Sequence, residues 1–345
     1  MSPIAHQYID RQTAHVITER FFGDRMVNTL YSSARERAPE LFHALTSFRT
    51  SQLLSYWTYD SRVMAKFSGM SRFTRSLGID LSECLDPPST LNTPRKVFER
   101  KIRYWDVRPM DDAQSTVVSP ADARVLFGSF ASSSMLFLKG KFFDFVDLLG
   151  QDKPLWRHAF QDGDYAIFRL TPDKYHYNHA PVSGTVIDSY EIPGCYHSCN
   201  PGPVISLATP FSKNKRTVTI IDTDVPDGSQ VGLVAMIEIV ALMIGTIVQC
   251  YSEHRYDDPQ DMSKGLFMKK GQPKSLYRPG SSTDVLIFQK HRITPCKDLI
   301  ENMHRQDVRS RYSLGFGQPL VETDITARST IATAYESKAY GQASR

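Results

Sequence analysis

The sequence lacks the features that mark several large classes of protein. It has five cysteines among 345 residues, which are too few and too scattered for a disulfide framework. Their odd number leaves at least one free thiol, so a reducing compartment is the simpler interpretation. The N-terminus has neither the basic nor the apolar segment of a secretory signal peptide, so no signal peptide is expected.

Strong charge of one sign is also absent. Lys and Arg total 41 against 37 Asp and Glu, which gives a net charge of +4. Without a long basic run, this excess does not predict nucleic-acid binding, although it mildly favours an anionic surface such as a lipid bilayer. The hydrophobic fraction of 41% and the charged fraction of 23% exclude wholesale disorder.

Motifs of several enzyme classes are missing as well. The chain has no Walker loop, no dinucleotide fingerprint and no Gly-x-Ser-x-Gly turn, which excludes kinase, NTPase and nicotinamide dehydrogenase functions. One apolar run, from Val231 to Cys250, is long enough to cross a bilayer. However, Glu238 near its middle would cost about 2.5–3.5 kcal/mol there. The Val and Ile content, with Gly232 and Gly245, instead predicts two buried strands joined by a tight turn.

The patterning predicts an α+β fold, with a helical N-terminal region followed by a β-rich body. Leu41, Leu45 and Phe48 recur at helical spacing within residues 1–92. Residues 93–326 form the predicted body, and residues 327–345 form a polar tail. Short β-rich runs separated by turn residues begin at position 116. These runs are Thr116–Val118, Val125–Phe127, Ser134–Leu138, Tyr165–Leu170, Val182–Ile187, Thr217–Ile221 and Val285–Phe288.

Four segments carry side chains with useful chemistry. Cys195-Tyr-His197-Ser-Cys199 lacks a fourth ligand and the usual cysteine spacing, so an ordinary loop is favoured and no metal site is predicted. Tyr175–Gly184 contains two histidines three residues apart, which suit proton transfer near neutral pH but are more often structural. Val118–Val125 is typical of a turn between strands. Tyr277–Phe288 contains a Gly-Ser-Ser-Thr turn that runs into an apolar strand.

Taken in order, the last three segments resemble the phosphatidylserine decarboxylase family. Ser119-Pro-Ala-Asp122 looks like that family's SPAD motif. Tyr175-His176-x-x-His179-x-Pro-x-x-Gly184 looks like its YHRxHxPxxG motif, and Gly280-Ser281-Ser282-Thr283 looks like its LGST or GGST processing site. The resemblance extends from about residue 93 to residue 326, which it identifies as a catalytic domain.

The resemblance implies a precursor that cleaves its own backbone before a serine. That serine becomes a pyruvoyl group, a covalent cofactor that blocks the N-terminus of the new α chain, while the preceding part becomes the β chain. The serine hydroxyl is a weak nucleophile and needs a general base oriented by an acid. By the resemblance, His179 is this base, and Asp122 orients its imidazole.

The resemblance also implies the reaction of the mature enzyme. The pyruvoyl ketone forms a Schiff base with phosphatidylserine and acts as an electron sink, so that CO2 leaves and phosphatidylethanolamine is formed. His176 matches the histidine proposed to return a proton to the α carbon.

Two positions depart from the family pattern. Tyr177 occupies the place of the motif's Arg, which puts in doubt the carboxylate or phosphate contact of that residue. Ser281 stands where the family has Gly, so the cleaved bond has two alternatives. The distance to Phe288 favours cleavage at Ser281–Ser282 with Ser282 as pyruvoyl precursor, whereas a Gly-Ser bond would select Ser281.

The substrate and the location follow from the same resemblance. A phosphatidylserine enzyme without a membrane span would bind peripherally on the cytoplasmic side of a membrane. The segment from Leu41 to Trp57 is a candidate docking surface, and its packing on the β-rich body is an equal alternative. The alternative function is pyruvoyl-dependent decarboxylation of a soluble amino acid such as tryptophan. A lipid-binding descendant without catalysis is a third alternative, and homo-oligomer formation stays open.

Overall fold

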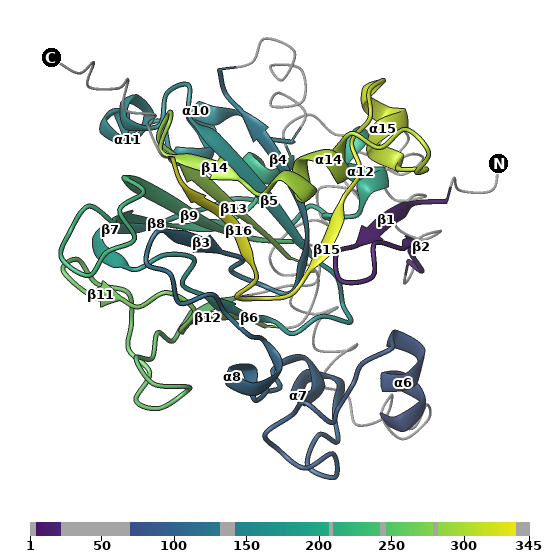
Figure 1. The fold of residues 1–345 in the computed structure, drawn as a ribbon. Helices are drawn as coiled ribbons and strands as arrows, with labels where there is room; N and C mark the ends of the chain where they lie inside the picture. Colours follow the sequence, from purple (N-terminus) through teal and green to yellow (C-terminus); the bar gives the residue numbers. More distant parts are fainter. Residues whose placement is uncertain are drawn as a thin grey trace, which may run out of the picture.

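A computed structural model describes residues 5–21, 70–131, 142–206, 210–241, 246–278 and 282–335 (Figure 1). Most of its strands belong to one ten-stranded sheet with the order β11-β7-β8-β9-β13-β5-β4-β15-β1-β2. Neighbouring strands are antiparallel except β1 and β15, which are parallel. In sheet order, the strands are Phe267–Met268, Gly184–Ile192, Arg216–Asp222, Leu233–Val240, Ser282–Phe288, Asp164–Leu170, Ala123–Ser129, Thr323–Ile325, Gln7–Asp10 and Val16–Thr18.

Two three-stranded sheets accompany the large one. The first has the order β10-β12-β6, with β10 at Ile247–Gln249, β12 at Pro273–Tyr277 and β6 at Tyr177–His179. The second has the order β14-β16-β3, with strands Ile293–Pro295, Thr330–Ala334 and Thr116–Val118. Thus β16 lies within the predicted polar tail, whose last residues, 336–345, lie outside the described part.

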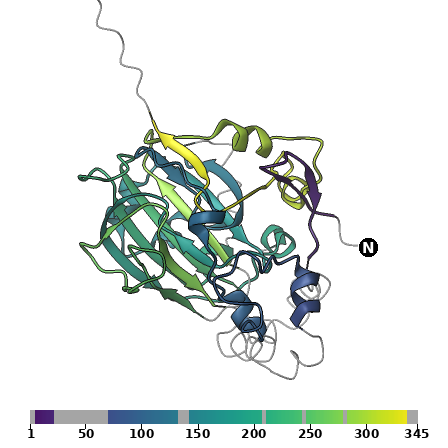
Figure 2. The same ribbon diagram turned by 60° about the horizontal axis from the view of Figure 1, so that its bottom comes forward.

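The described helices are short and lie around the sheets. Three of them, α6, α7 and α8, lie below β6 and β12 at the bottom of Figure 1, with α6 beside α7, and come forward in Figure 2. Thr93 caps α7, because its side chain accepts the backbone N–H of Lys96, and Pro94 occupies the first turn. The helices are α6 Met70–Leu77, α7 Pro94–Phe98, α8 Tyr104–Val107, α10 Phe145–Leu149, α11 Pro154–Ala159, α12 Pro201–Ser206, α13 Pro210–Lys213, α14 Lys297–Met303 and α15 Arg311–Phe316.

The predicted fold class, α+β with a helical N-terminal region, is wrong. The described N-terminal residues, 5–21, form the strands β1 and β2, and the fold is dominated by the ten-stranded sheet. These strands have only four and three residues, and β1 is held by β15 from the other end of the chain, which no local pattern reveals. The helical pattern at Leu41–Phe48 and the proposed docking segment at Leu41–Trp57 lie outside the described residues.

Several strand predictions are confirmed. Thr116–Val118 is β3, Tyr165–Leu170 lies in β5, Thr217–Ile221 lies in β8 and Val285–Phe288 lies in β13, whereas the predicted strand at 134–138 lies outside the described residues.

The long apolar run forms strands, as predicted. It contains the buried β9 and then β10, while residues 242–245 between them are not described. Within the described ranges, no helix is long and apolar enough to span a membrane. The predicted domain boundary at residues 92 and 93 stays a prediction.

Candidate active site

Ser282 is the first residue of β13, near the middle of the large sheet. All seven residues of β13 pair in continuous register with β5 and β9, and Ser282 lies between Leu170 and Val240. Its hydroxyl is fully buried and has no hydrogen-bond partner within the described part of the chain. Such a group costs about 1–3 kcal/mol, so its presence calls for a functional explanation. Ser281 and Gly280 lie outside the described residues.

The face of β13 that carries Ser282 is covered by the small sheet of β6 and β12. Asp284 shares this face because side chains two residues apart in a strand point to the same side. It pairs in register with Glu238 of β9, and its carboxyl oxygen Oδ1 accepts the Tyr277 hydroxyl at 2.7 Å. The side-chain amide of Asn178, in β6, donates a hydrogen bond to Oε1 of Glu238 at 3.2 Å. The two layers therefore meet through polar side chains next to Ser282.

A buried ion pair lies at the centre of this polar layer. The Nζ atom of Lys274 lies 2.7 Å from Oε2 of Glu238, and both side chains are fully buried. Glu238 also accepts hydrogen bonds from Gln249, Asn178 and Ser275. Burial alone raises the pKa of Glu238, but Lys274 outweighs it and holds the pKa below its ordinary value. Glu238, whose charge argues against a membrane-spanning segment, is thus part of this site.

The pKa of Asp284 is shifted in the opposite direction from that of Glu238. Burial, and then the charge of Glu238, raise the pKa of its carboxyl well above the ordinary value. The oxygen Oδ2 has no hydrogen-bond partner within the described residues. The surroundings of Asp284, two residues after Ser282, therefore favour its protonated form, and no sequence motif identified this residue.

The two histidines of the second motif lie on different sides of their segment. The carbonyl of His176 accepts the backbone N–H of Tyr277 at 3.0 Å. Paired residues of antiparallel strands share a face, so His176 is on the side of Tyr277, which faces β13. Asn178 also faces that way. Because adjacent side chains alternate, His179 points to the opposite side.

His176 is fully buried next to α7. Its Nδ1 atom lies 2.7 Å from the carbonyl oxygen of Lys174, to which it donates, and its ring centroid lies 4.6 Å from that of Phe98. The carbonyl contact fixes the hydrogen on Nδ1, so in the neutral ring Nε2 carries the lone pair.

His179 lies in an aromatic layer between β6 and α8. Its Nδ1 atom lies 2.8 Å from the carbonyl oxygen of Gly271, and its Nε2 atom lies 3.1 Å from the Tyr175 hydroxyl. The ring of Tyr104 contacts it edge-on at 4.7 Å. Burial lowers the pKa of His179 to about 4, so that the imidazole is neutral near pH 7.

Tyr177, the departure from the family motif, also belongs to this layer. Its ring stacks on Tyr175 with centroids 5.6 Å apart and meets the edge of Tyr256 at 5.0 Å. An arginine at this position would place a charge among these rings, whereas tyrosine completes their packing.

Asp122 lies in the turn between β3 and β4, where both of its oxygens bind Arg108. Arg108 donates to Oδ1 at 2.9 Å and to Oδ2 at 2.8 Å, and the backbone N–H of Ala327 also donates to Oδ1. Burial alone raises the pKa of Asp122, but Arg108 overcomes it and keeps the pKa below its ordinary value. The other side of Arg108 binds the carboxylate of Glu83.

The structure brings the first two motifs together through their backbones. The N–H of His179 donates to the carbonyl of Pro120 at 2.6 Å, and the N–H of Val118 donates to the carbonyl of Pro181 at 2.9 Å. The side chains of Asp122 and His179 do not hydrogen-bond to each other, because Asp122 binds Arg108 and His179 binds Gly271 and Tyr175. The catalytic roles predicted for these residues stay predictions.

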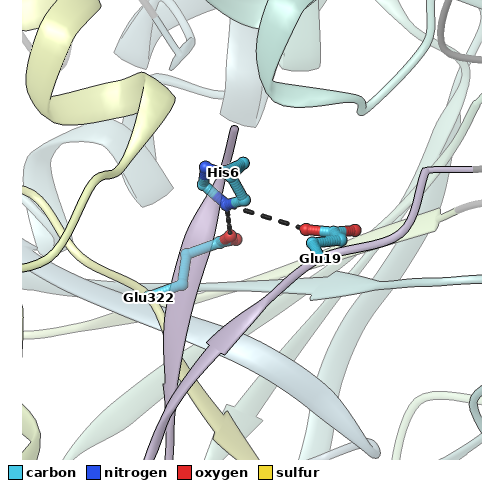
Figure 3. Close-up of side chains that lie close together, drawn as sticks. All are labelled: His6, Glu19 and Glu322. Carbon is cyan, nitrogen blue, oxygen red and sulfur yellow. Dashed lines mark hydrogen bonds and ion pairs between the residues drawn. The ribbon is translucent and has the colours of Figure 1, made fainter. Parts of the chain in front are cut away.

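A separate buried cluster joins the N-terminal strands to the sheet (Figure 3). The Nε2 atom of His6 lies 2.8 Å from Glu322 and 3.7 Å from Glu19. One histidine and two carboxylates are suitable metal ligands. However, Arg169 binds both carboxylates, at 2.8 and 2.6 Å, and Arg124 also binds Glu19. These cations already balance the acids, so the cluster is an ion-pair network.

Comparisons with known proteins agree with the motifs. A sequence profile of the phosphatidylserine decarboxylase family matches residues 95–315. A phosphatidylserine decarboxylase proenzyme of Fusobacterium nucleatum is 29% identical over 90% of this chain and 95% of its own length. One from Chlamydia trachomatis is 30% identical over 89% of this chain and 95% of its own length. The chain therefore belongs to the phosphatidylserine decarboxylase family, a family of carboxy-lyases.

Proposed function

We propose that this protein is a phosphatidylserine decarboxylase that matures by cleaving its own chain between Ser281 and Ser282. The observation that carries the proposal is Ser282 itself, a buried serine without a hydrogen-bond partner within the described residues, at the start of a central strand. The similar proteins named phosphatidylserine decarboxylase proenzymes support both the cleavage and the substrate.

Maturation begins with the attack of the Ser282 hydroxyl on the carbonyl carbon of Ser281. After its Nε2 atom exchanges the Tyr175 hydroxyl for that of Ser282, His179 takes the serine proton and gives it to the amide nitrogen as the C–N bond breaks, which leaves an ester. Loss of the α proton of residue 282 then expels the Ser281 carboxylate. Water hydrolyses the resulting dehydroalanine to a ketone and ammonia. The products are a β chain of residues 1–281 and an α chain that starts with a pyruvoyl group.

The protonation state of His179 supports its role as a base, while its ring lies on the side of β6 that faces away from β13. Its imidazole is neutral near pH 7, because burial lowers its pKa to about 4, and the Gly271 carbonyl fixes the hydrogen on Nδ1. The negative charge of Asp122 raises the same pKa in part, so it favours the protonated ring that forms during the reaction. We assign to Asp122 a positioning role, since it holds the turn whose Pro120 carbonyl binds the His179 backbone.

His176 is proposed to serve the second reaction. The pyruvoyl group, when formed, supplies the electron sink that allows the substrate's carboxylate to leave. His176 lies on the side of its segment that faces β13, where a proton must be returned to the substrate. Its role is proton delivery to the α carbon.

The substrate is proposed to be phosphatidylserine at a membrane surface, with the protein bound peripherally on the cytoplasmic side. The names of the similar proteins support this substrate over a soluble amino acid. Vesicles that contain phosphatidylserine should yield CO2 and phosphatidylethanolamine, whereas free L-tryptophan should yield no CO2. The reverse result would favour the soluble amino-acid decarboxylase.

Intact-protein mass spectrometry tests the proposal directly. We expect two fragments, of which the smaller begins with a pyruvoyl group derived from Ser282. A fragment that begins one residue earlier would identify Ser281 as the precursor. A single stable, unmodified chain would refute self-cleavage and favour a lipid-binding protein without catalysis.

A further inference from the structure

A buried arginine outside all three motifs lacks an anionic partner. Arg100 follows α7, and its side chain belongs to a residue that is only 5% exposed. Its Nη1 and Nη2 atoms donate to the carbonyl oxygens of Val97 and Asp173, each at 3.0 Å. Its Nε atom is buried without a hydrogen-bond partner, and no carboxylate of the described residues forms an ion pair with the guanidinium.

The surroundings of Arg100 do not balance its charge. Burial lowers the pKa of the guanidinium, and the acidic groups around it raise this pKa only in part. The two nearby carboxylates, Asp122 and Glu83, bind Arg108 instead. An unpaired charge in a protein interior costs free energy. A cation that is kept there without a partner therefore indicates an anion that the protein binds.

Arg100 contacts the segment that continues from the strand beside Ser282. Ser282 pairs in register with Leu170, the last residue of β5. Asp173, whose carbonyl accepts from Arg100, comes three residues after Leu170. Three residues span at most about 11 Å, so this carbonyl stays close to the start of β13.

The same arginine is also close to His176. The ring of Phe98, two residues before Arg100, lies with its centroid 4.6 Å from that of His176. The Nδ1 atom of His176 donates to the carbonyl of Lys174, the residue that follows the one bound by Arg100. His176 is the proposed proton donor, and residue 282 is the proposed pyruvoyl precursor. A substrate placed between these two residues therefore has Arg100 as a neighbour.

The headgroup of phosphatidylserine carries two anionic groups, a carboxylate and a phosphodiester. The carboxylate leaves as CO2, so a cation fixed on it would stabilise the substrate more than the transition state and slow the reaction. The phosphodiester keeps its charge throughout, so a cation bound to it holds the substrate without opposing the reaction. The planar guanidinium group matches the oxygens of a phosphate in geometry as well as in charge. The phosphodiester is therefore the better partner.

We propose that Arg100 binds the phosphodiester of the phosphatidylserine headgroup and thereby selects substrates that carry this group. The inference rests on the proposed function, in which phosphatidylserine is the substrate. Tyr177 occupies the place of the motif's Arg, and Arg100 supplies a cation from a different segment. The bonds to the Val97 and Asp173 carbonyls hold the side chain in place, while its remaining N–H groups donate to the phosphodiester oxygens.

The first test measures KM and kcat for the release of CO2 from dihexanoyl-phosphatidylserine, a soluble lipid, so that binding to a bilayer does not enter. Rates are expressed per cleaved chain. Arg100→Met removes the charge and leaves an unbranched side chain, and we expect KM to rise about ten- to a hundredfold with kcat unchanged. Lys96→Gln is the matched control, because it removes an exposed positive charge from α7, where Lys96 donates to the Thr90 carbonyl at 3.1 Å. Its KM should equal that of the parent.

The second test measures binding to the mature enzyme without turnover, by titration calorimetry. Dihexanoyl-phosphatidylglycerol has the phosphodiester but no amine, and N-acetyl-L-serine has a carboxylate but no phosphate. Arg100→Met should weaken binding of the lipid about ten- to a hundredfold and leave binding of N-acetyl-L-serine unchanged. A purely structural role of Arg100 would weaken both ligands alike. Inorganic phosphate should bind more weakly than the lipid, because the site is built for a headgroup.

The outcomes separate this inference from the proposed function. A parental KM in Arg100→Met, a lower kcat with an unchanged KM, or equal losses for both ligands overturns the inference while the proposed function stands. Inorganic phosphate that binds as tightly as the lipid also overturns it, since the site would then be one for free phosphate. A parent chain that is not cleaved, or that releases no CO2 from phosphatidylserine, refutes the proposed function instead.

A second variant covers the case in which Arg100→Met does not fold, as judged by its melting curve. Arg100→Lys keeps the charge but loses the planar group that can donate two parallel hydrogen bonds. It must then raise KM with kcat unchanged, and a parental KM would overturn the inference.

Discussion

The neutral acid beside Ser282 makes the stability of the fold depend on pH. Asp284 is fully buried, and burial and Glu238 raise its pKa well above the ordinary value. The folded state therefore holds a proton that the unfolded chain releases above its own pKa of about 3.9. The stabilising contribution is complete below that pKa and is lost as the pH rises through the folded-state pKa. Between these two values, the free energy of unfolding falls by about 1.4 kcal/mol per pH unit.

Asp284→Asn should remove this slope. The asparagine oxygen can still accept the Tyr277 hydroxyl, and the side chain is neutral at every pH. Relative to its parent, the variant should therefore gain about 1.4 kcal/mol for each pH unit above the unfolded pKa, until the folded-state pKa is reached. Urea unfolding at several values between about pH 5 and about pH 8 measures the difference. Both chains carry Ser282→Ala, so that each is a single polypeptide.

The exposed Asp106 provides a control for this experiment. Asp106→Asn removes a carboxyl whose side chain is 58% exposed, so it shows what the loss of one carboxyl outside the core does to the unfolding curves. If Asp284→Asn showed a difference from its parent that was constant with pH, or lost stability increasingly as the pH rose, Asp284 would be ionised in the folded state. The assignment of a neutral acid next to Ser282 would then be wrong.

The remaining predictions concern cleavage and the buried ion pair. Ser282→Ala should give one uncleaved, inactive chain on a gel, and normal cleavage would contradict the assignment of the precursor. His179→Gln should block cleavage, whereas His176→Ala should be cleaved and fail to release CO2; the opposite pattern would exchange the two roles. Lys274→Met should lower the free energy of unfolding by about 3–5 kcal/mol in urea, because Glu238 stays buried without its cation. An unchanged midpoint of urea unfolding would mean that groups other than Lys274 balance the negative charge of Glu238.

The sequence was informative where local pattern decides the structure. The apolar run at 231–250 correctly predicted two strands, and the run at 285–288 correctly predicted the strand after the serine. The N-terminal strands were missed because β1 depends on β15, more than three hundred residues away in the chain. A strand of four residues has too few positions to show a period, and only its partner stabilises it.

The candidate site also depends on contacts between residues that are far apart in the sequence, which local patterns do not reveal. Its motifs identified side chains that are close in sequence, but not the groups that bind them. Arg108, Gly271 and Tyr256 contact motif residues through the fold, and no spacing rule connects them with Asp122, His179 or Tyr175. One signal was available: Asp284 interrupts an apolar strand, and a carboxyl in a buried strand needs a partner or a proton.

The spacing of the two histidines explains how one motif can supply two different environments. Residues an odd number of positions apart point to opposite sides of an extended segment. His176 therefore shares the side of Tyr277 and Asn178, which bind the polar groups of β9 and β13. His179 enters the aromatic layer, where its imidazole stays neutral. In a helix, the same spacing would place both rings on one face, in one environment. The strand thus provides the physical basis for assigning cleavage and turnover to different histidines, and the two single variants decide which ring serves which step.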